Sequence, residues 1–222
     1  MRVSLPSGTA AELALPSGDA TRGLVLAPDI GGLRPLFDDL CAQLARDHGW
    51  AVCAPEPFAG RETLEVPERL GVVGELDDDR QLGDLLAAAE RLESEAGVDR
   101  VAVLGFCMGG MYALKAAGIG RFDRAVAFYG MIRIPEQWQS ASQGEPLSYL
   151  ERDGAAPTLA IIGGLDGWTP PADVDALRSV GSHVDVVVYD DAEHGFAHDP
   201  SRPAHRAQDA ADAWAKSVDF LA

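Results

Sequence analysis

A cysteine flanked by glycines follows a short apolar run near the middle of the chain. The run VAVL at residues 101–104 leads into GFCMGG at 105–110, and a helical pattern begins directly afterwards. A strand, a sharp turn carrying the nucleophile and a helix, in this order, form a nucleophile elbow. Glycine is needed two residues before and after the nucleophile, because a β-carbon there would crowd the neighbouring strand and helix. The motif predicts that Cys107 is a nucleophile, and a buried structural cysteine is the alternative.

An elbow at Cys107 predicts two partners later in the chain, an acid and then a histidine, each after a strand. Asp166 follows the apolar run 159–162, and His194 follows the run 184–189. A histidine oriented by a carboxylate can take the proton of a thiol, and the dipole of the following helix also favours the thiolate. Taken singly, Asp166 could be a turn residue and His194 a surface-loop residue. Their order behind Cys107 favours a catalytic triad.

The other cysteines and a second nearby histidine fit structural roles. His198 stands four residues after His194, but the glutamate of the zinc motif H-E-x-x-H is missing, so no metal site is predicted. Cys41 lies on the apolar side of a helical pattern and Cys53 lies inside a strand pattern, which is typical of small core residues. Three cysteines, an odd number in a chain this long, do not form a disulfide framework.

Short apolar runs alternate with amphipathic stretches along the whole chain. Strands are expected at 11–15, 23–27, 50–54, 100–105, 124–129, 158–163 and 183–189. Helices are expected at 35–47, 78–96, 107–117, 172–180 and 204–221. This alternation predicts an α/β fold with a mostly parallel central sheet and helices on both faces. Two long irregular stretches, 56–75 and 131–156, are candidates for binding loops or lids.

The charge and composition of the chain exclude several classes of function. Eighteen basic and 35 acidic residues give a net charge of −17, which repels phosphate backbones and anionic lipid surfaces. We therefore expect neither nucleic-acid nor membrane partners. No apolar run approaches the roughly 20 residues that span a bilayer, and the N-terminus lacks a signal-peptide pattern. We expect a single domain over residues 1–222, in a cytoplasmic protein that is a monomer or a homodimer.

Four motifs resemble those of the dienelactone hydrolase family of α/β-hydrolases. They are GFCMGG at 105–110, GGLDGWTP at 163–170, EHGF at 193–196 and APDIGG at 27–32. The resemblance extends from about residue 10 to the C-terminus. Its specific part is the cysteine in the elbow, because most α/β-hydrolases carry serine there. The resemblance implies the α/β-hydrolase fold and a triad of Cys107, Asp166 and His194.

The same resemblance implies several further site residues. The family places an acidic residue, usually glutamate, after the strand expected at 23–27, where it is thought to hold or deprotonate the resting thiol. This chain has Asp29 there, and a turn-forming aspartate is the alternative. The backbone N–H groups of Ile30 and Met108 would form the oxyanion hole. Tyr129 matches a family position near the substrate.

The resemblance is weaker at the expected binding site for a substrate carboxylate. Well-studied members use an arginine a few residues after the triad histidine, and this chain has His198 at that place. Arg80, at the start of a helical pattern, could supply a second cationic contact, and the alternative is a solvated arginine paired with Asp77, Asp78 or Asp79. Arg202 and Arg206 are further possible substitutes.

These residues together predict a cysteine hydrolase of small esters or lactones that acts through a thioacyl enzyme, without a metal or organic cofactor. A thiolate is a good leaving group, so it is expelled unless the substrate's own leaving group departs more easily. This favours activated esters and enol lactones over simple alkyl esters. The alternatives are a general carboxylesterase or thioesterase, and a hydrolase-fold binding protein with an inert cysteine. A binding protein does not need an acid and a histidine at those loops, which favours an enzyme.

Overall fold

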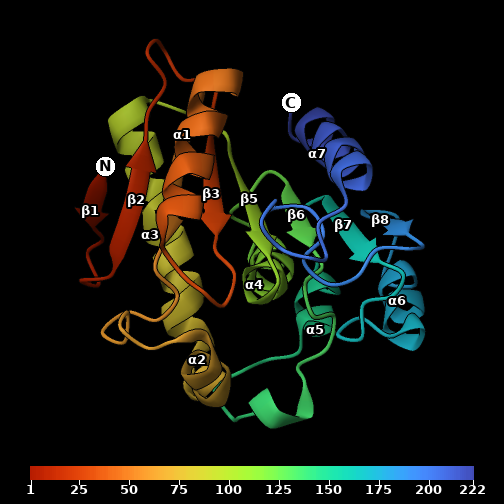
Figure 1. Ribbon diagram of the computed structural model, residues 1–222. Helices are drawn as coiled ribbons and strands as arrows, with labels where there is room; N and C mark the ends of the chain where they lie inside the picture. The colour runs from red at the N-terminus through yellow and green to blue at the C-terminus, as the bar shows by residue number, and fades with distance from the viewer.

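The computed structural model describes residues 1–222 and contains one eight-stranded sheet (Figure 1). Its strands are β1 (Arg2–Ser4), β2 (Ala10–Ala14), β3 (Arg22–Ala27), β4 (Trp50–Pro55), β5 (Val101–Phe106), β6 (Ala125–Phe128), β7 (Thr158–Gly163) and β8 (Val184–Tyr189). Their order is β1-β2-β4-β3-β5-β6-β7-β8, parallel from β4 to β8 and antiparallel at β1 and β2. The expected mostly parallel sheet is confirmed. β1 has three residues, too few to show an alternating pattern in the sequence.

Helices cover both faces of this sheet (Figure 1). On one face, α1 (Pro35–His48) and α7 (Ala207–Leu221) bury their apolar side chains against the strands. On the other lie α3 (Asp78–Ala96), α4 (Met108–Ala117), α5 (Pro146–Leu150) and α6 (Pro171–Arg178). Strands β3 to β7 are buried along their whole length, which explains why they are near-continuous apolar runs. No helix combines the length and apolar character needed to cross a bilayer.

The ends of the helices follow local signals in the sequence. Asp77 caps α3 by accepting the backbone N–H of Arg80 at 3.1 Å, and Gly97 ends that helix with a φ of 64°. Gly49 ends α1 in the same left-handed conformation, with a φ of 68°. The last helix starts at Ala207 and not near residue 204, because residues 199–205 form two consecutive turns instead.

The two irregular stretches contain short helices that the sequence pattern did not indicate. The first holds α2 (Val66–Val72) and a 3-10 turn (Val73–Glu75), and the second holds a 3-10 turn (Glu136–Trp138) and α5. The second stretch is held in place by Asp78, which accepts the N–H of Gly144 at 2.8 Å and pairs with Lys115 at 2.7 Å. In Figure 1, α2 and the turn at 136–138 lie at the same end of the molecule.

The strand order reverses direction at β3, which pairs with β4 on one side and β5 on the other. The chain passes from β3 through α1 to β4, and then crosses through α3 to β5. In open α/β sheets, ligands bind outside the carboxyl ends of the strands at such a switch point. The elbow after β5 and the loop after β3 both lie there.

Candidate active site

Cys107 lies in the turn between β5 and α4, with a φ of 57° and a ψ of −121°. Positive φ at a residue other than glycine costs about 1–3 kcal/mol, and such strain clusters at active sites. A β-carbon at Gly105 would lie 2.1 Å from the carbonyl oxygen of Gly109, and one at Gly109 would lie 2.1 Å from that of Ala27. The expected collision of a β-carbon with the neighbouring helix and strand is thus confirmed at both flanking glycines.

Asp166 and His194 approach the elbow from the carboxyl ends of β7 and β8. Asp166 is buried in the turn after β7, where its Oδ1 accepts the backbone N–H of Trp168 at 2.9 Å. Its Oδ2 lies 2.7 Å from Nδ1 of His194, which follows β8. His194 in turn lines the same cavity as Cys107. The structure therefore brings together the three side chains that the sequence singled out.

The two ring nitrogens of His194 have different surroundings. Nδ1 contacts Asp166, whereas Nε2 is buried and makes no hydrogen bond within the chain. Burial lowers the pKa of His194, but Asp166 and the adjacent Cys107 outweigh burial and raise the pKa from 6.5 to about 9. A carboxylate on one nitrogen and a thiol beside the other match the geometry of a nucleophile, a base and an orienting acid.

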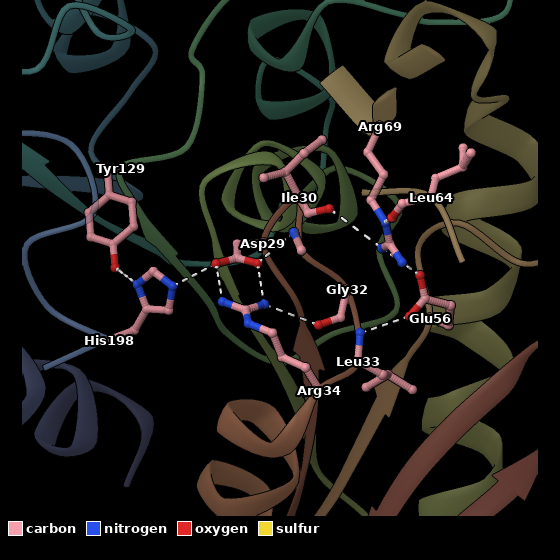
Figure 2. A network of polar contacts seen from close by, with 11 residues as sticks. Asp29, Ile30, Gly32, Leu33, Arg34, Glu56, Leu64, Arg69, Tyr129 and His198 are labelled. Carbon is pink, nitrogen blue, oxygen red and sulfur yellow. Dashed lines mark hydrogen bonds and ion pairs between the residues drawn. The ribbon is translucent and has the colours of Figure 1, made fainter. Parts of the chain in front are cut away.

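Asp29, two residues after β3, is held by four hydrogen bonds (Figure 2). Arg34 donates to its two oxygens at 2.6 and 2.8 Å, Gly31 donates its N–H at 2.8 Å, and Nε2 of His198 donates at 2.8 Å. Burial raises the pKa of Asp29, but His198 and Arg34 outweigh burial and hold it well below its usual range. No hydrogen bond joins Asp29 to Cys107. The implied contact with the resting thiol is not formed, because other donors occupy the carboxylate.

His198 and Tyr129 lie behind Asp29 and not in the cavity. The ring of His198 is buried and stacks on Phe106 at 4.8 Å. Its Nδ1 contacts the Tyr129 hydroxyl, so both ring nitrogens have partners (Figure 2). Tyr129 is fully buried with a φ of 39°, and its ring lies 5.2 Å from that of His194. Neither side chain is among the residues that line the cavity, so the geometry gives no support to the expected contact of these two residues with substrate.

A second ion pair holds the other end of the loop after β3, and sequence reasoning missed it. Glu56, directly after β4, pairs with Arg69 of α2 at 3.0 Å, and both side chains are buried. Glu56 also accepts the N–H of Leu33 at 2.7 Å, and Arg69 contacts the carbonyl oxygen of Ile30 at 3.5 Å (Figure 2). An acid directly after a buried strand is the signal that could have identified Glu56. Its partner is 13 residues away, in an irregular stretch without periodicity.

The two backbone N–H groups expected at the oxyanion hole have no acceptor that would compete with a substrate. Met108 is the first residue of α4, so its N–H has no intrahelical partner. The N–H of Ile30 makes no hydrogen bond within the chain, and Ile30 lines the cavity of Cys107. The close approach of Gly109 to Ala27 brings the end of β3 against the start of α4. Both donors therefore lie at the same end of the sheet as the nucleophile.

Arg80 lies outside this region. Its Nε donates to Asp84 at 3.1 Å, and its Nη2 donates to the hydroxyl of Thr9 at 2.8 Å. Arg80 is not among the residues that line the cavity of Cys107. The geometry therefore gives no support to the expected contact with a substrate carboxylate. Arg80 is paired with an aspartate, as in the alternative, but the partner is Asp84 and not one of the three aspartates at 77–79.

Cys107 and His194 open into a cavity of about 640 Å³. Three arginines line this cavity, and two of them are paired: Arg34 with a carboxylate at 2.6 Å and Arg69 with another at 3.0 Å. The guanidinium of Arg202, eight residues after the triad histidine, makes no ion pair. No group of three or more His, Cys, Asp or Glu side chains could hold a metal ion. A larger cavity of about 880 Å³ between α1 and α7 contains neither Cys107 nor His194.

Both irregular stretches contribute apolar walls to the catalytic cavity. Val66 and Leu70 of α2 line one part, and Trp138 and Trp168 line another. The two tryptophan rings stack with their centroids 5.2 Å apart and their planes at 21°. Sequence reasoning expected binding loops in the two irregular stretches, which contain Val66, Leu70 and Trp138, but it did not single out these side chains. Trp168 lies outside both stretches, in the motif GGLDGWTP.

The chain is similar to known proteins along nearly its whole length. The model of the dienelactone hydrolase family matches residues 9–222. A protein of Escherichia coli K12 named "Putative carboxymethylenebutenolidase" is 30% identical over 209 residues, which cover 89% of this chain and 75% of that protein. A Bradyrhizobium protein named "Probable 2-oxo-3-(5-oxofuran-2-ylidene)propanoate lactonase" is also 30% identical, over 89% of this chain and 82% of its own.

A solved structure is similar to this chain in its fold. The crystal structure of a "Putative Dienelactone Hydrolase" from Klebsiella pneumoniae superposes with a TM-score of 0.88 at 26% identity, and the match covers all of this chain and 97% of the other. The fold is that of the α/β-hydrolases. With the family model matched along nearly the whole chain, the protein belongs to the dienelactone hydrolase family, whose members hydrolyse ester and lactone bonds.

Proposed function

We propose that the protein hydrolyses small esters or lactones through a covalent intermediate on Cys107, with His194 as the base and Asp166 as the orienting acid. The observation that carries this proposal is the asymmetry of His194. Asp166 occupies Nδ1 at 2.7 Å, and Nε2 is buried without a partner beside Cys107. A buried nitrogen without a partner is costly in a folded protein, and a proton-transfer role accounts for it.

In the first half of the reaction, Nε2 of His194 takes the thiol proton and Sγ of Cys107 attacks the carbonyl carbon. The C–O bond to the leaving group then breaks, and the departing oxygen receives the proton from His194. In the second half, His194 takes a proton from water, the hydroxide attacks the thioester carbon, and the C–S bond breaks. The proton returns to the thiolate, which restores the resting pair.

The negative charge on the carbonyl oxygen is assigned to the backbone N–H groups of Ile30 and Met108. One such donor is worth about 3–4 kcal/mol in the transition state of related acyl transfers. The loop that carries Ile30 is held at one end by the ion pair of Asp29 and Arg34. The buried ion pair of Glu56 and Arg69 holds its other end. Asp29 therefore acts as a positioning residue and not as the base for the thiol.

We further propose that the substrate carries a carboxylate and that Arg202 binds it. This arginine lines the cavity beside His194 and has no counter-ion in the chain. A guanidinium that lacks an ion pair in a chain of net charge −17 is a specific site for a carboxylate. Arg202 is thus proposed for the carboxylate-binding role that the sequence analysis considered for Arg80 and for the position of His198.

Turnover of p-nitrophenyl acetate, with and without iodoacetamide, tests the proposed function. We expect iodoacetamide to abolish turnover, and mass spectrometry during the steady state to find one acetyl group on Cys107. Cys41 and Cys53 are internal controls, because burial raises the pKa of both thiols and leaves them unreactive. Absence of turnover would indicate a binding protein. Equal rates for p-nitrophenyl acetate and an enol lactone would favour a general carboxylesterase.

A further inference from the structure

Exposed apolar side chains are concentrated around the mouth of the catalytic cavity. Six large hydrophobic side chains are exposed in the whole chain, and four of them line this cavity or the depression that adjoins it at His194: Val66, Leu70, Leu165 and Trp168. The other two, Met1 and Leu15, lie near the N-terminus. Scattered exposed apolar residues are ordinary, but a cluster at a cavity marks a binding surface.

Trp168 is the best-defined element of this cluster. Its ring stacks on the buried ring of Trp138, and its backbone N–H donates to the triad acid Asp166 at 2.9 Å. Trp168 is 37% exposed, and the centroid of its ring lies 6.4 Å from that of His194. Stacking from one side and the hydrogen bond at its base fix the ring, so it offers a preorganised aromatic surface.

The position of Trp168 beside His194 decides which part of a substrate it meets. In acyl transfer the histidine gives its proton to the leaving group, so the leaving-group oxygen must come within hydrogen-bond reach of Nε2. The atoms attached to that oxygen then lie on the His194 side of the cavity, where Trp168 and Leu165 stand. A planar leaving group would stack on the indole there.

The volume of the cavity and the chemistry of the thiolate favour the same kind of leaving group. A cavity of about 640 Å³ lies in the size range that holds drug-sized ligands. A phenol, with an ordinary pKa near 10 as in tyrosine, leaves far more readily than an alkyl alcohol. A thiolate nucleophile requires such a leaving group if the intermediate is to collapse forward.

We propose that Trp168 and Leu165 form a subsite for an aromatic leaving group, so that the preferred substrates are aryl esters. The proposal rests on the proposed function, because it assigns the leaving-group side from the role of His194. In the reaction, the C–O bond between the acyl carbon and the aryl oxygen breaks, and the phenol leaves with the proton that His194 took from Cys107. The acyl group stays on sulfur until water removes it.

The test compares two acetate esters whose alcohols are about equally acidic. One is 2-naphthyl acetate, and the other is hexafluoroisopropyl acetate, whose leaving group is compact and not aromatic. We expect the wild-type kcat/KM to be at least tenfold higher for the naphthyl ester, about 1.4 kcal/mol. Trp168→Ala should remove this preference while hydrolysis of the fluorinated ester continues, which confirms that the triad is intact. Trp168→Phe should retain most of the preference, because it keeps an aromatic face.

Leu15→Ala is the matched control, because Leu15 is 44% exposed and lines none of the cavities described. It should leave both esters unaffected. Equal wild-type kcat/KM for the two esters, or a naphthyl preference that survives in Trp168→Ala, would overturn the subsite and leave the proposed function standing. Failure of the wild-type protein to hydrolyse either ester would instead overturn the proposed function.

Discussion

The molecule contains two aspartate–histidine pairs at nearly the same distance, and their surroundings differ. Asp166 and His194 approach to 2.7 Å, and Asp29 and His198 approach to 2.8 Å. His194 keeps one nitrogen without a partner next to Cys107. Both ring nitrogens of His198 are hydrogen-bonded, and Asp29 also accepts hydrogen bonds from Arg34 and from the N–H of Gly31. The capacity for proton transfer therefore depends on the unused nitrogen and not on the pair itself.

The electrostatics of the two pairs differ in the same way. The pKa of His194 is raised to about 9, because the carboxylate and the thiol side chain favour the protonated ring over the opposing effect of burial. In the other pair, His198 and Arg34 instead lower the pKa of Asp29. Arg34 thus makes Asp29 a stable anion that holds the loop 29–33, whereas Asp166 has no arginine partner and is paired with His194 alone.

The largest expected effect on activity is that of removing the Cys107 thiol, which lies beside the unbonded Nε2 of His194. Cys107→Ala should lower kcat for p-nitrophenyl acetate by at least about a thousandfold, because loss of a nucleophile removes the covalent route. The melting temperature should change little, since alanine fits the turn between β5 and α4. Steady-state kinetics and a thermal melt check both expectations. Retention of more than a few per cent of the activity would show that another residue is the nucleophile.

Substituting the two aspartates separately tests the comparison directly. Asp166→Asn should lower kcat by roughly 10⁴-fold, as expected where the acid sets the histidine tautomer, with little loss of stability. Asp29→Asn should instead lower the free energy of unfolding by about 1.5–3 kcal/mol, the usual worth of hydrogen bonds to a charged group, with a much smaller loss of kcat. Urea unfolding and kinetics on both variants separate the roles. The reverse pattern would assign the catalytic carboxylate to Asp29.

The two pairs should also depend on pH in opposite directions. His194 has a folded pKa above its ordinary 6.5, so its contribution to stability is complete below pH 6.5 and is lost as the pH rises to about 9. Asp29 has a folded pKa below its ordinary 3.8, so its contribution is present above pH 3.8 and is lost as the pH falls further.

Urea unfolding of each variant beside the wild-type protein measures these contributions. The stability difference between wild type and His194→Gln should shrink from about pH 6 to about pH 9. The difference between wild type and Asp29→Asn should shrink as the pH falls from about 4 to about 2. Differences that stay constant over these ranges would contradict the two shifts in pKa.

The smallest expected effect concerns Arg202, which follows His194 and His198 in the chain. Arg202→Ala should raise KM about tenfold, or about 1.4 kcal/mol, for a lactone that bears a carboxylate, and should not affect a neutral ester. Arg80→Ala is the control, because its guanidinium is bonded to Asp84 and Thr9 outside the cavity. An equal response of the two variants would mean that neither arginine binds the carboxylate.

The sequence by itself determined the parallel sheet and the order of the three candidate triad residues. Buried parallel strands are apolar along their whole length, and an elbow needs glycine at fixed offsets from Cys107. Asp166 and His194 could be found because each lies in the loop that follows a predicted strand, β7 and β8 respectively. Helix bounds were predicted closely where Gly49, Asp77 and Gly97 mark the ends. All of these signals act between residues close together in the chain.

Only the tertiary structure decided what Asp29, His198 and Arg80 do. Asp29 and His198 are 169 residues apart, and no local pattern announces that they meet. The sequence also could not reveal that Arg202 lacks a counter-ion while Arg34 and Arg69 each have one, because their acidic partners are not marked by any pattern near the arginines in the chain. Whether a polar side chain is free or bonded depends on which groups the fold brings within about 3 Å, and that is a property of packing.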